Sequence, residues 1–105
     1  MKRTTRFFKA LSDRTRLQIL WLIFRKGHAS IQDIEQILGI PSTRASGHLK
    51  YLMNAGVIMN RPDLQGPRYR VMQQTDPFRR VTLEGLKCRL CEPGVAAHLE
   101  PKLKQ

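Results

Sequence analysis

Two cysteines close to the end of the chain, Cys88 and Cys91, are the residues whose type and spacing best suit binding chemistry. Residues three apart on a helix are neighbours, so both sulfurs can face one ligand. Soft ions prefer thiolate ligands; arsenite or antimonite would take three, and zinc or cadmium four. The pair therefore predicts a site for such an ion. The missing ligands would come from a second copy of the chain, from solvent or from His98, which is otherwise a solvated tail residue.

Other interpretations of the cysteine pair stay open. In one, Cys88 and Cys91 form a reversible disulfide or polysulfide link and so sense oxidant or reactive sulfur. A straight helix disfavours a Cys–Cys bond at that spacing, which ranks this interpretation second. In another, the pair is structural and buried. At about 100° per residue, a stripe of three leucines lies nearly opposite the cysteines, which weakens that alternative: Leu83, Leu86 and Leu90.

Residues 30–56 predict two short helices with a tight break between them. Gly39 supplies the left-handed residue that commonly ends a helix, and Pro41 cannot continue one. This is the pattern of a helix-turn-helix, whose second helix enters a DNA major groove. The alternatives are an αα-hairpin with a solvated polar face and, for His48, a packing role. The exposed face of the second helix has no acidic residue and consists of Ser42, Thr43, Arg44, Ser46, Gly47, His48 and Lys50.

A β-hairpin is predicted directly after the second helix. Strand-like runs over residues 57–61 and 68–72 flank a six-residue tip, which is too long for a two-residue turn. Beside a helix-turn-helix such a hairpin is a wing, whose arginines contact phosphates or the minor groove. Alternatively, they are solvated charges that discourage aggregation at the strand edge. The arginines concerned are Arg61, Arg68 and Arg70.

Composition and charge favour a nucleic-acid partner, with an anionic membrane second. The 105 residues include 19 Lys and Arg against 8 Asp and Glu, a formal net charge of +11 spread along the chain. The length fits a single domain over residues 1–105. Without a membrane-spanning run or signal peptide, a soluble cytoplasmic protein with reduced cysteines is expected. The scattered histidines and the lack of a Gly-rich phosphate loop argue against an enzyme.

Apolar spacing and capping residues predict the other helices. Residues 1–11 form a basic amphipathic lead-in, and residues 16–26 are apolar almost all round, which predicts a central buried helix. Ser12 is the expected cap of that helix, with Asp13 in its first turn. Gly27 ends the helix.

Two further capping signals lie later in the chain. Ser30 and Asp33 resemble a capping pair. The dipeptide Asp76-Pro77 opens a last helix, which runs to about Cys91 before Pro93-Gly94 stops it. Residues from about 92 to 105 are expected to be a mobile tail.

With those residues laid out, the chain resembles the ArsR/SmtB family of winged helix-turn-helix transcriptional repressors over roughly residues 7–73. Residues 10–16 are close to the family's opening Ala-Leu-Ser-Asp-x-x-Arg, which an apolar helix follows. Residues 46–52 and 55–58 are similar to its Ser-x-His-Leu-x-x-Leu and Ala-Gly-aliphatic signatures. Two motifs in register are more specific than a helix-turn-helix alone.

The resemblance implies a mainly α fold with a small β-hairpin, and a homodimer built from the first and last helices. It implies a repressor that binds palindromic double-stranded DNA and releases it when an inducer binds. The family's Cys-x-Cys metal pair is replaced here by Ser30 and Gln32, and its Asp and His site on the last helix lacks the histidine.

Any sensor must therefore lie elsewhere, and the CxxC pair is the evident candidate. The expected inducer is arsenite or antimonite at Cys88 and Cys91, and no cofactor is required. Zinc or cadmium, oxidant or reactive sulfur, and no small-molecule sensing are the alternatives.

Overall fold

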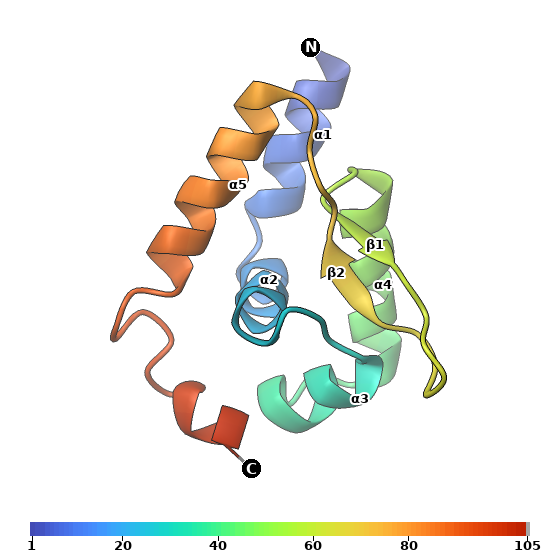
Figure 1. The fold of residues 1–105 in the computed structure, drawn as a ribbon, viewed down its shortest axis with the longest axis vertical. Coiled ribbons are helices and arrows are strands. Elements are labelled where there is room, and N and C mark those ends of the chain that lie inside the picture. The colour runs from blue at the N-terminus through green and yellow to red at the C-terminus, as the bar shows by residue number, and fades with distance from the viewer. Residues whose placement is uncertain (105) are drawn as a thin grey trace. The chain divides into compact units, whose positions relative to one another are not determined.

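The computed structural model describes residues 1–104, which divide into two compact units, Met1–Met72 and a second from Gln73 onward. The first unit, shown in Figure 1, contains α1 (Lys2–Leu11), α2 (Arg14–Lys26), α3 (Ile31–Asp33), the π-type turn η1 (Ile34–Leu38), α4 (Ser42–Asn54), β1 (Ile58–Asn60) and β2 (Tyr69–Val71). The second unit contains α5 (Pro77–Leu90) and the 3-10 helix η2 (Glu100–Lys104). The predicted mainly α fold with a small hairpin is confirmed.

Helix α2 is the buried centre of the first unit. It contacts α1, η1, α4 and β2, so it is covered from several sides, as its apolar sequence predicts. Gly27 ends α2 in the left-handed conformation, with φ of 87°. Five consecutive residues of α2 are at most 1% exposed: Ile19, Leu20, Trp21, Leu22 and Ile23.

The cap of α2 differs from the prediction. Asp13, and not Ser12, is the N-cap: its backbone is extended and its carboxylate accepts the Arg16 backbone N–H at 3.0 Å. Ser12 ends α1 instead, where its backbone N–H and its hydroxyl both donate to the Lys9 carbonyl at 3.2 Å. The prediction was wrong because α1 and α2 are separated by only two residues, and Ser12 completes the first helix.

The helix-turn-helix is built from the predicted local signals. Ser30 and Asp33 form a reciprocal capping box, in which each side chain accepts the other residue's backbone N–H at 3.0 Å. Gly39 has φ of 70° and ends the first helix of the motif. Pro41 stands at the N-cap of α4 without a side-chain hydrogen bond. Helix α4 therefore begins at Ser42, as the sequence predicts.

The wing is an antiparallel hairpin in which Met59 lies opposite Arg70. Backbone bonds continue beyond the strands: the Met72 N–H donates to Val57 at 2.9 Å and the Arg61 N–H donates to Arg68 at 2.7 Å. The strands are therefore shorter than the predicted runs of residues 57–61 and 68–72, although hydrogen bonds pair the residues at both ends of those runs.

Tyr69 adds a pairing that the sequence did not predict. Its backbone exchanges two bonds of 2.8 and 3.0 Å with Ala29, so the segment before α3 extends the small sheet on its other side.

The tip of the wing is tighter than predicted. Asp63 and Gly66 exchange two backbone hydrogen bonds, of 3.0 and 3.1 Å, which leaves only Leu64 and Gln65 between them. The expectation of an open six-residue tip is wrong. The Asp63 carboxylate accepts the Gln65 N–H at 2.8 Å, and Gly66 adopts φ of 119°, so the chain folds back early.

Helix α5, the first helix of the second unit, begins where the sequence predicts. Asp76 caps α5 by accepting the Phe78 N–H at 3.0 Å, Pro77 is the first helical residue, and Cys91 follows the last. Turns then lead to η2, and Ala96 and Leu99 are buried. The mobility expected from residue 92 onward stays a prediction, and residue 105 lies outside the described part. No helix described in residues 1–104 is long and apolar enough to cross a membrane.

Candidate nucleic-acid interface and cysteine pair

Helix α4 has two sharply different faces. One faces the core and is at most 1% exposed at Ala45, Leu49 and Leu52. The other carries polar, basic and small residues, and α4 contains no acidic side chain. A helix that enters a DNA groove needs such a surface, because phosphates repel carboxylates. Six of the seven contact residues predicted on α4 are exposed: Ser42, Thr43, Arg44, Ser46, Gly47 and Lys50.

His48, the seventh, is only half-exposed and faces the junction of α2 and α4. Its Nδ1 lies 3.5 Å from Nη1 of Arg16 and 3.9 Å from Oδ2 of Asp13. With the proton on Nε2, the ring accepts a hydrogen bond from the guanidinium. These contacts favour the packing role, one of the two roles predicted for His48, and its contact with DNA stays a prediction.

Arg16 on α2 contacts both α1 and α4, and the sequence analysis did not predict these contacts. Its Nε and Nη2 donate to the carbonyls of Ala10 and Lys9, both at 2.9 Å. Those carbonyls end α1, where a positive charge also interacts favourably with the helix dipole. The guanidinium lies 4.1 Å from the centroid of the Tyr51 ring on α4. One side chain of α2 therefore connects the end of α1 to the candidate recognition helix.

The only signal that could have found Arg16 is its place as the last residue of the Ala-Leu-Ser-Asp-x-x-Arg motif. The motif marks the position, but the partners of Arg16 on α4 become visible only in the fold.

Asp13, beside this junction, makes stability depend on pH. The hydrogen bond from the Arg16 backbone N–H is the largest cause that lowers the pKa of Asp13 below its ordinary value of 3.8. Partial burial raises the pKa, and the charges of Arg16 and His48 lower it further. A carboxylate with a lowered folded-state pKa stabilises the fold above its unfolded pKa, and that contribution is lost as the pH falls through the folded-state pKa.

We therefore expect Asp13→Asn to be less stable than wild type at neutral pH. The difference should stay below about 1 kcal/mol, because asparagine also caps helices and solvent screens the charge. Below about pH 4 it should shrink, since Asp13 is then progressively protonated. Thermal unfolding of both proteins from neutral to acid pH measures this, and a difference independent of pH would contradict the assignment.

The three wing arginines differ in what they already contact. Arg68 is engaged within the tip: its Nε lies 3.4 Å from the Asp63 carboxylate and its Nη2 donates to Gln65 at 2.8 Å. Its side chain is only 14% exposed. Arg70 is half-buried on β2, whereas Arg61 is exposed. The wing therefore presents Arg61 most openly to a partner, and Arg68 shapes the tip.

The wing and α4 are presented in a common direction. Helix α4 packs against β1 and against the turn before it. In Figure 1 the hairpin tip extends toward the same end of the first unit as the start of α4. A single elongated partner can therefore meet both, which is the arrangement that a DNA-binding wing requires.

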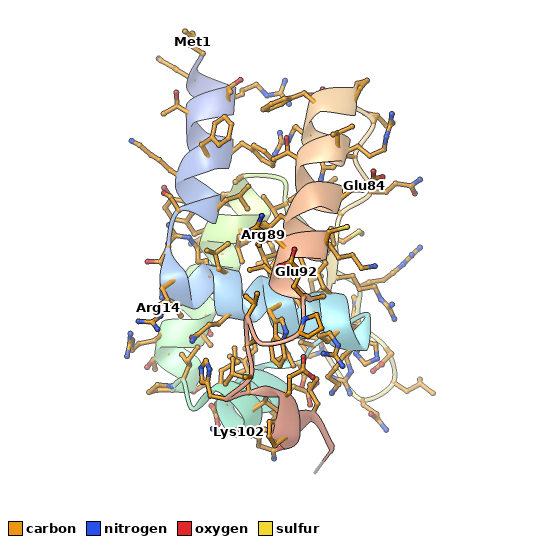
Figure 2. The ribbon with its side chains drawn as sticks, turned by 90° about the vertical axis from the view of Figure 1, so that its left-hand side faces the viewer. Met1, Arg14, Glu84, Arg89, Glu92 and Lys102 are labelled. Carbon is orange, nitrogen blue, oxygen red and sulfur yellow. The ribbon has the colours of Figure 1, made fainter. Side chains whose placement is uncertain are left out.

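The cysteine pair lies at the end of α5, and both residues are thiols. Cys88 is exposed and Cys91 half-buried, while the opposite stripe has Leu83 buried. Near them, Nε of Arg89 lies 3.7 Å from the Glu92 carboxylate, and Figure 2 shows both residues at the end of the helix.

The predicted extra ligand is not grouped with the thiols. His98 is exposed, and residues 1–104 hold no cluster of three or more His, Cys, Asp or Glu side chains placed to bind a metal.

Comparisons with known proteins agree with this geometry. Residues 12–59 match a family model described as winged helix-turn-helix DNA-binding. A probable mercury resistance operon repressor of Streptomyces lividans is 41% identical over 68 residues, which cover 65% of this chain and 54% of that protein. The arsenic resistance transcriptional regulator ArsR1 of Pseudomonas putida is 30% identical over 79 residues, which cover 75% of this chain and 62% of that protein. The chain is similar to repressors of the ArsR/SmtB family.

ArsR/SmtB proteins are DNA-binding transcriptional regulators and not enzymes. The fold of this chain is also that of a solved structure, the homodimeric winged helix-turn-helix domain Mb0332 from Mycobacterium bovis, described as a possible ArsR-family regulator. The TM-score is 0.66 at 22% identity, covering 89% of this chain and 82% of that one. The chain spans only 54% and 62% of the two curated relatives named above.

Proposed function

We propose that this chain is a transcriptional repressor that binds double-stranded DNA through α4 and the wing. The observation that carries the proposal is the exposed, acid-free face of α4, directly opposite its buried face. In this assignment Arg44 and Lys50 supply the charged contacts, and Ser42, Thr43 and Ser46 supply short hydroxyl donors. His48 acts mainly by positioning, and Arg61 contacts the backbone or minor groove from the wing.

The proposed repressor acts as a homodimer on a palindromic operator. Each of the two helices assigned to the dimer contact exposes apolar surface: Phe8 on α1 is 49% exposed, and Phe78 and Val81 on α5 are 48% and 62% exposed. Phe78 and Val81 are three residues apart and so share one side of α5. Two copies related by a two-fold axis would read half-sites about one helical turn apart.

The DNA-binding proposal is tested with a duplex that the wild-type chain selects from a randomised library, against a scrambled duplex of equal length. We expect tighter binding to the selected duplex, and a palindrome within it. Affinity should fall steeply with salt, by about 1000-fold or more between 50 and 200 mM if six or more phosphates are contacted.

A variant pair refines this experiment. Arg61→Ala should weaken binding to both duplexes and reduce the salt slope by about one unit. Asn54→Ala, an exposed change in the last turn of α4, serves as the control. Equal affinity for selected and scrambled duplexes would instead indicate a merely basic surface.

The proposed inducer is a thiophilic ion held by Cys88 and Cys91, with arsenite or antimonite first. Both residues are thiols: exposed Cys88 lies in the last turn of α5, and Cys91 is the C-cap three residues later. Names of curated relatives refer to arsenic and mercury, whose ions are soft and prefer sulfur ligands. One chain supplies two sulfurs, and the partner's cysteines or solvent would complete the coordination. In the proposed dimer, α5 contacts the second copy of the chain. An ion bound at the end of α5 would therefore alter the distance between the two α4 helices and so release DNA.

A further inference from the structure

Gly47 is an unexpected residue in the middle of α4. Glycine is the least favourable residue after proline inside a helix, because its backbone has the most freedom to lose. Gly39 and Gly66 are explained by their positive φ, but Gly47 has no such conformation. A Cβ added at Gly47 would meet nothing within 4 Å, so no neighbour in the chain requires a glycine there. The fold alone therefore does not account for Gly47.

The position of Gly47 on α4 points to an external reason. At about 100° per residue, Gly47 lies almost directly opposite the centre of the buried stripe. It is consequently the residue of α4 farthest from the core, at the crest of the exposed face. Thr43 lies about one turn before it and Lys50 about one turn after it, and all three are exposed. The buried stripe consists of Ala45, Leu49 and Leu52.

We propose that Gly47 is the point of closest approach between α4 and the duplex. This inference rests on the proposed DNA-binding function and deepens it, since it says how far the helix inserts. Without a side chain at the crest, the backbone of α4 can reach the floor of the major groove. Thr43 and Lys50 on either side can then reach base edges and phosphates. Gly47 acts as a specificity-determining residue through the absence of a side chain.

Gly47→Ala and Gly47→Leu test the inference in the full chain. Alanine and leucine both favour helix more than glycine does, so Gly47→Ala should raise the melting temperature by about 4 °C. Yet its affinity for the selected duplex should fall about tenfold, and that of Gly47→Leu about a hundredfold, because added carbon atoms must be accommodated in a tight contact. A change that stabilises the protein and weakens its binding cannot be attributed to damage of the fold.

Arg44→Ala, measured on the same duplex, distinguishes the close approach at Gly47 from the use of α4 in DNA binding. If both Gly47 variants bind like wild type while Arg44→Ala weakens binding, the close approach at Gly47 is overturned and the use of α4 stands. If none of the three variants weakens binding, the proposed DNA-binding face is overturned as well. A lower melting temperature for Gly47→Ala also overturns the inference, because the glycine would then serve the fold.

Discussion

Replacing both Cys88 and Cys91 with serine is expected to abolish release of DNA by the inducer while leaving DNA affinity unchanged. Cys88 lies in the last turn of α5 and Cys91 directly follows that helix, so both thiols are outside the first unit, which holds α4 and the wing. Serine keeps the size of the side chain but removes the soft thiolate that such ions require. The ion concentration that releases half of the DNA should therefore rise more than about 100-fold. That is more than is usual when a residue that only hydrogen-bonds to a metal ligand is replaced.

Fluorescence anisotropy of the selected duplex, titrated with arsenite, mercuric ion or cadmium ion, measures this release. The single variants Cys88→Ser and Cys91→Ser show whether both sulfurs take part, and melting temperatures confirm that each variant is folded. A thiol oxidant in a parallel titration distinguishes a redox response from ion binding. Release that survives in the double variant would rule out the pair as the sensor, but would leave the DNA-binding proposal intact.

Arg16→Lys is expected to damage both the stability of the protein and its binding to DNA, although the charge is retained. Lysine cannot reproduce the fork that donates to Lys9 and Ala10 while it lies over Tyr51. We expect the free energy of unfolding to fall by about 2 kcal/mol, or roughly 10 °C in melting temperature. Because α4 loses a link to α2, DNA affinity should fall about tenfold even where the variant is fully folded.

Arg14→Lys is the matched control for this prediction. Arg14 lies on the same turn of α2, is exposed and stands at the outer edge of the helix in Figure 2. The same chemical change there should alter melting temperature and affinity little. Chemical denaturation and anisotropy on the selected duplex measure both effects. Equal behaviour of the two variants would show that the contacts of Arg16 do not position α4.

Local signals predicted most of the secondary structure of this chain. The capping box of Ser30 and Asp33, the left-handed Gly39 and the Asp76 cap each depend on atoms within a few residues. Such features are readable from sequence because their partners are neighbours in the chain. The two motifs that resemble the ArsR/SmtB family, in residues 10–16 and 46–58, are also short local sequences. The burial of α2 was predictable for another reason, because Gln18 is the only polar residue between Leu17 and Phe24.

The alternation of core and exposed residues on α4 was also determined by the sequence alone. The periodicity of Ala45, Leu49 and Leu52 assigns one face to the core, and what remains is the candidate contact face. The crest position of Gly47 could have been derived in the same way. Its interpretation needed the structure, which shows that no part of the fold occupies the space beside it.

Only the tertiary structure decided how these elements are held together. Arg16 and His48 are 32 residues apart, and no local pattern pairs them. The bridge between Ala29 and Tyr69, and the engagement of Arg68 with the tip of the wing, likewise depend on a compact chain. A periodic pattern specifies which side of a helix is buried, but a hydrogen bond between distant residues exists only once packing has brought both helices to one place.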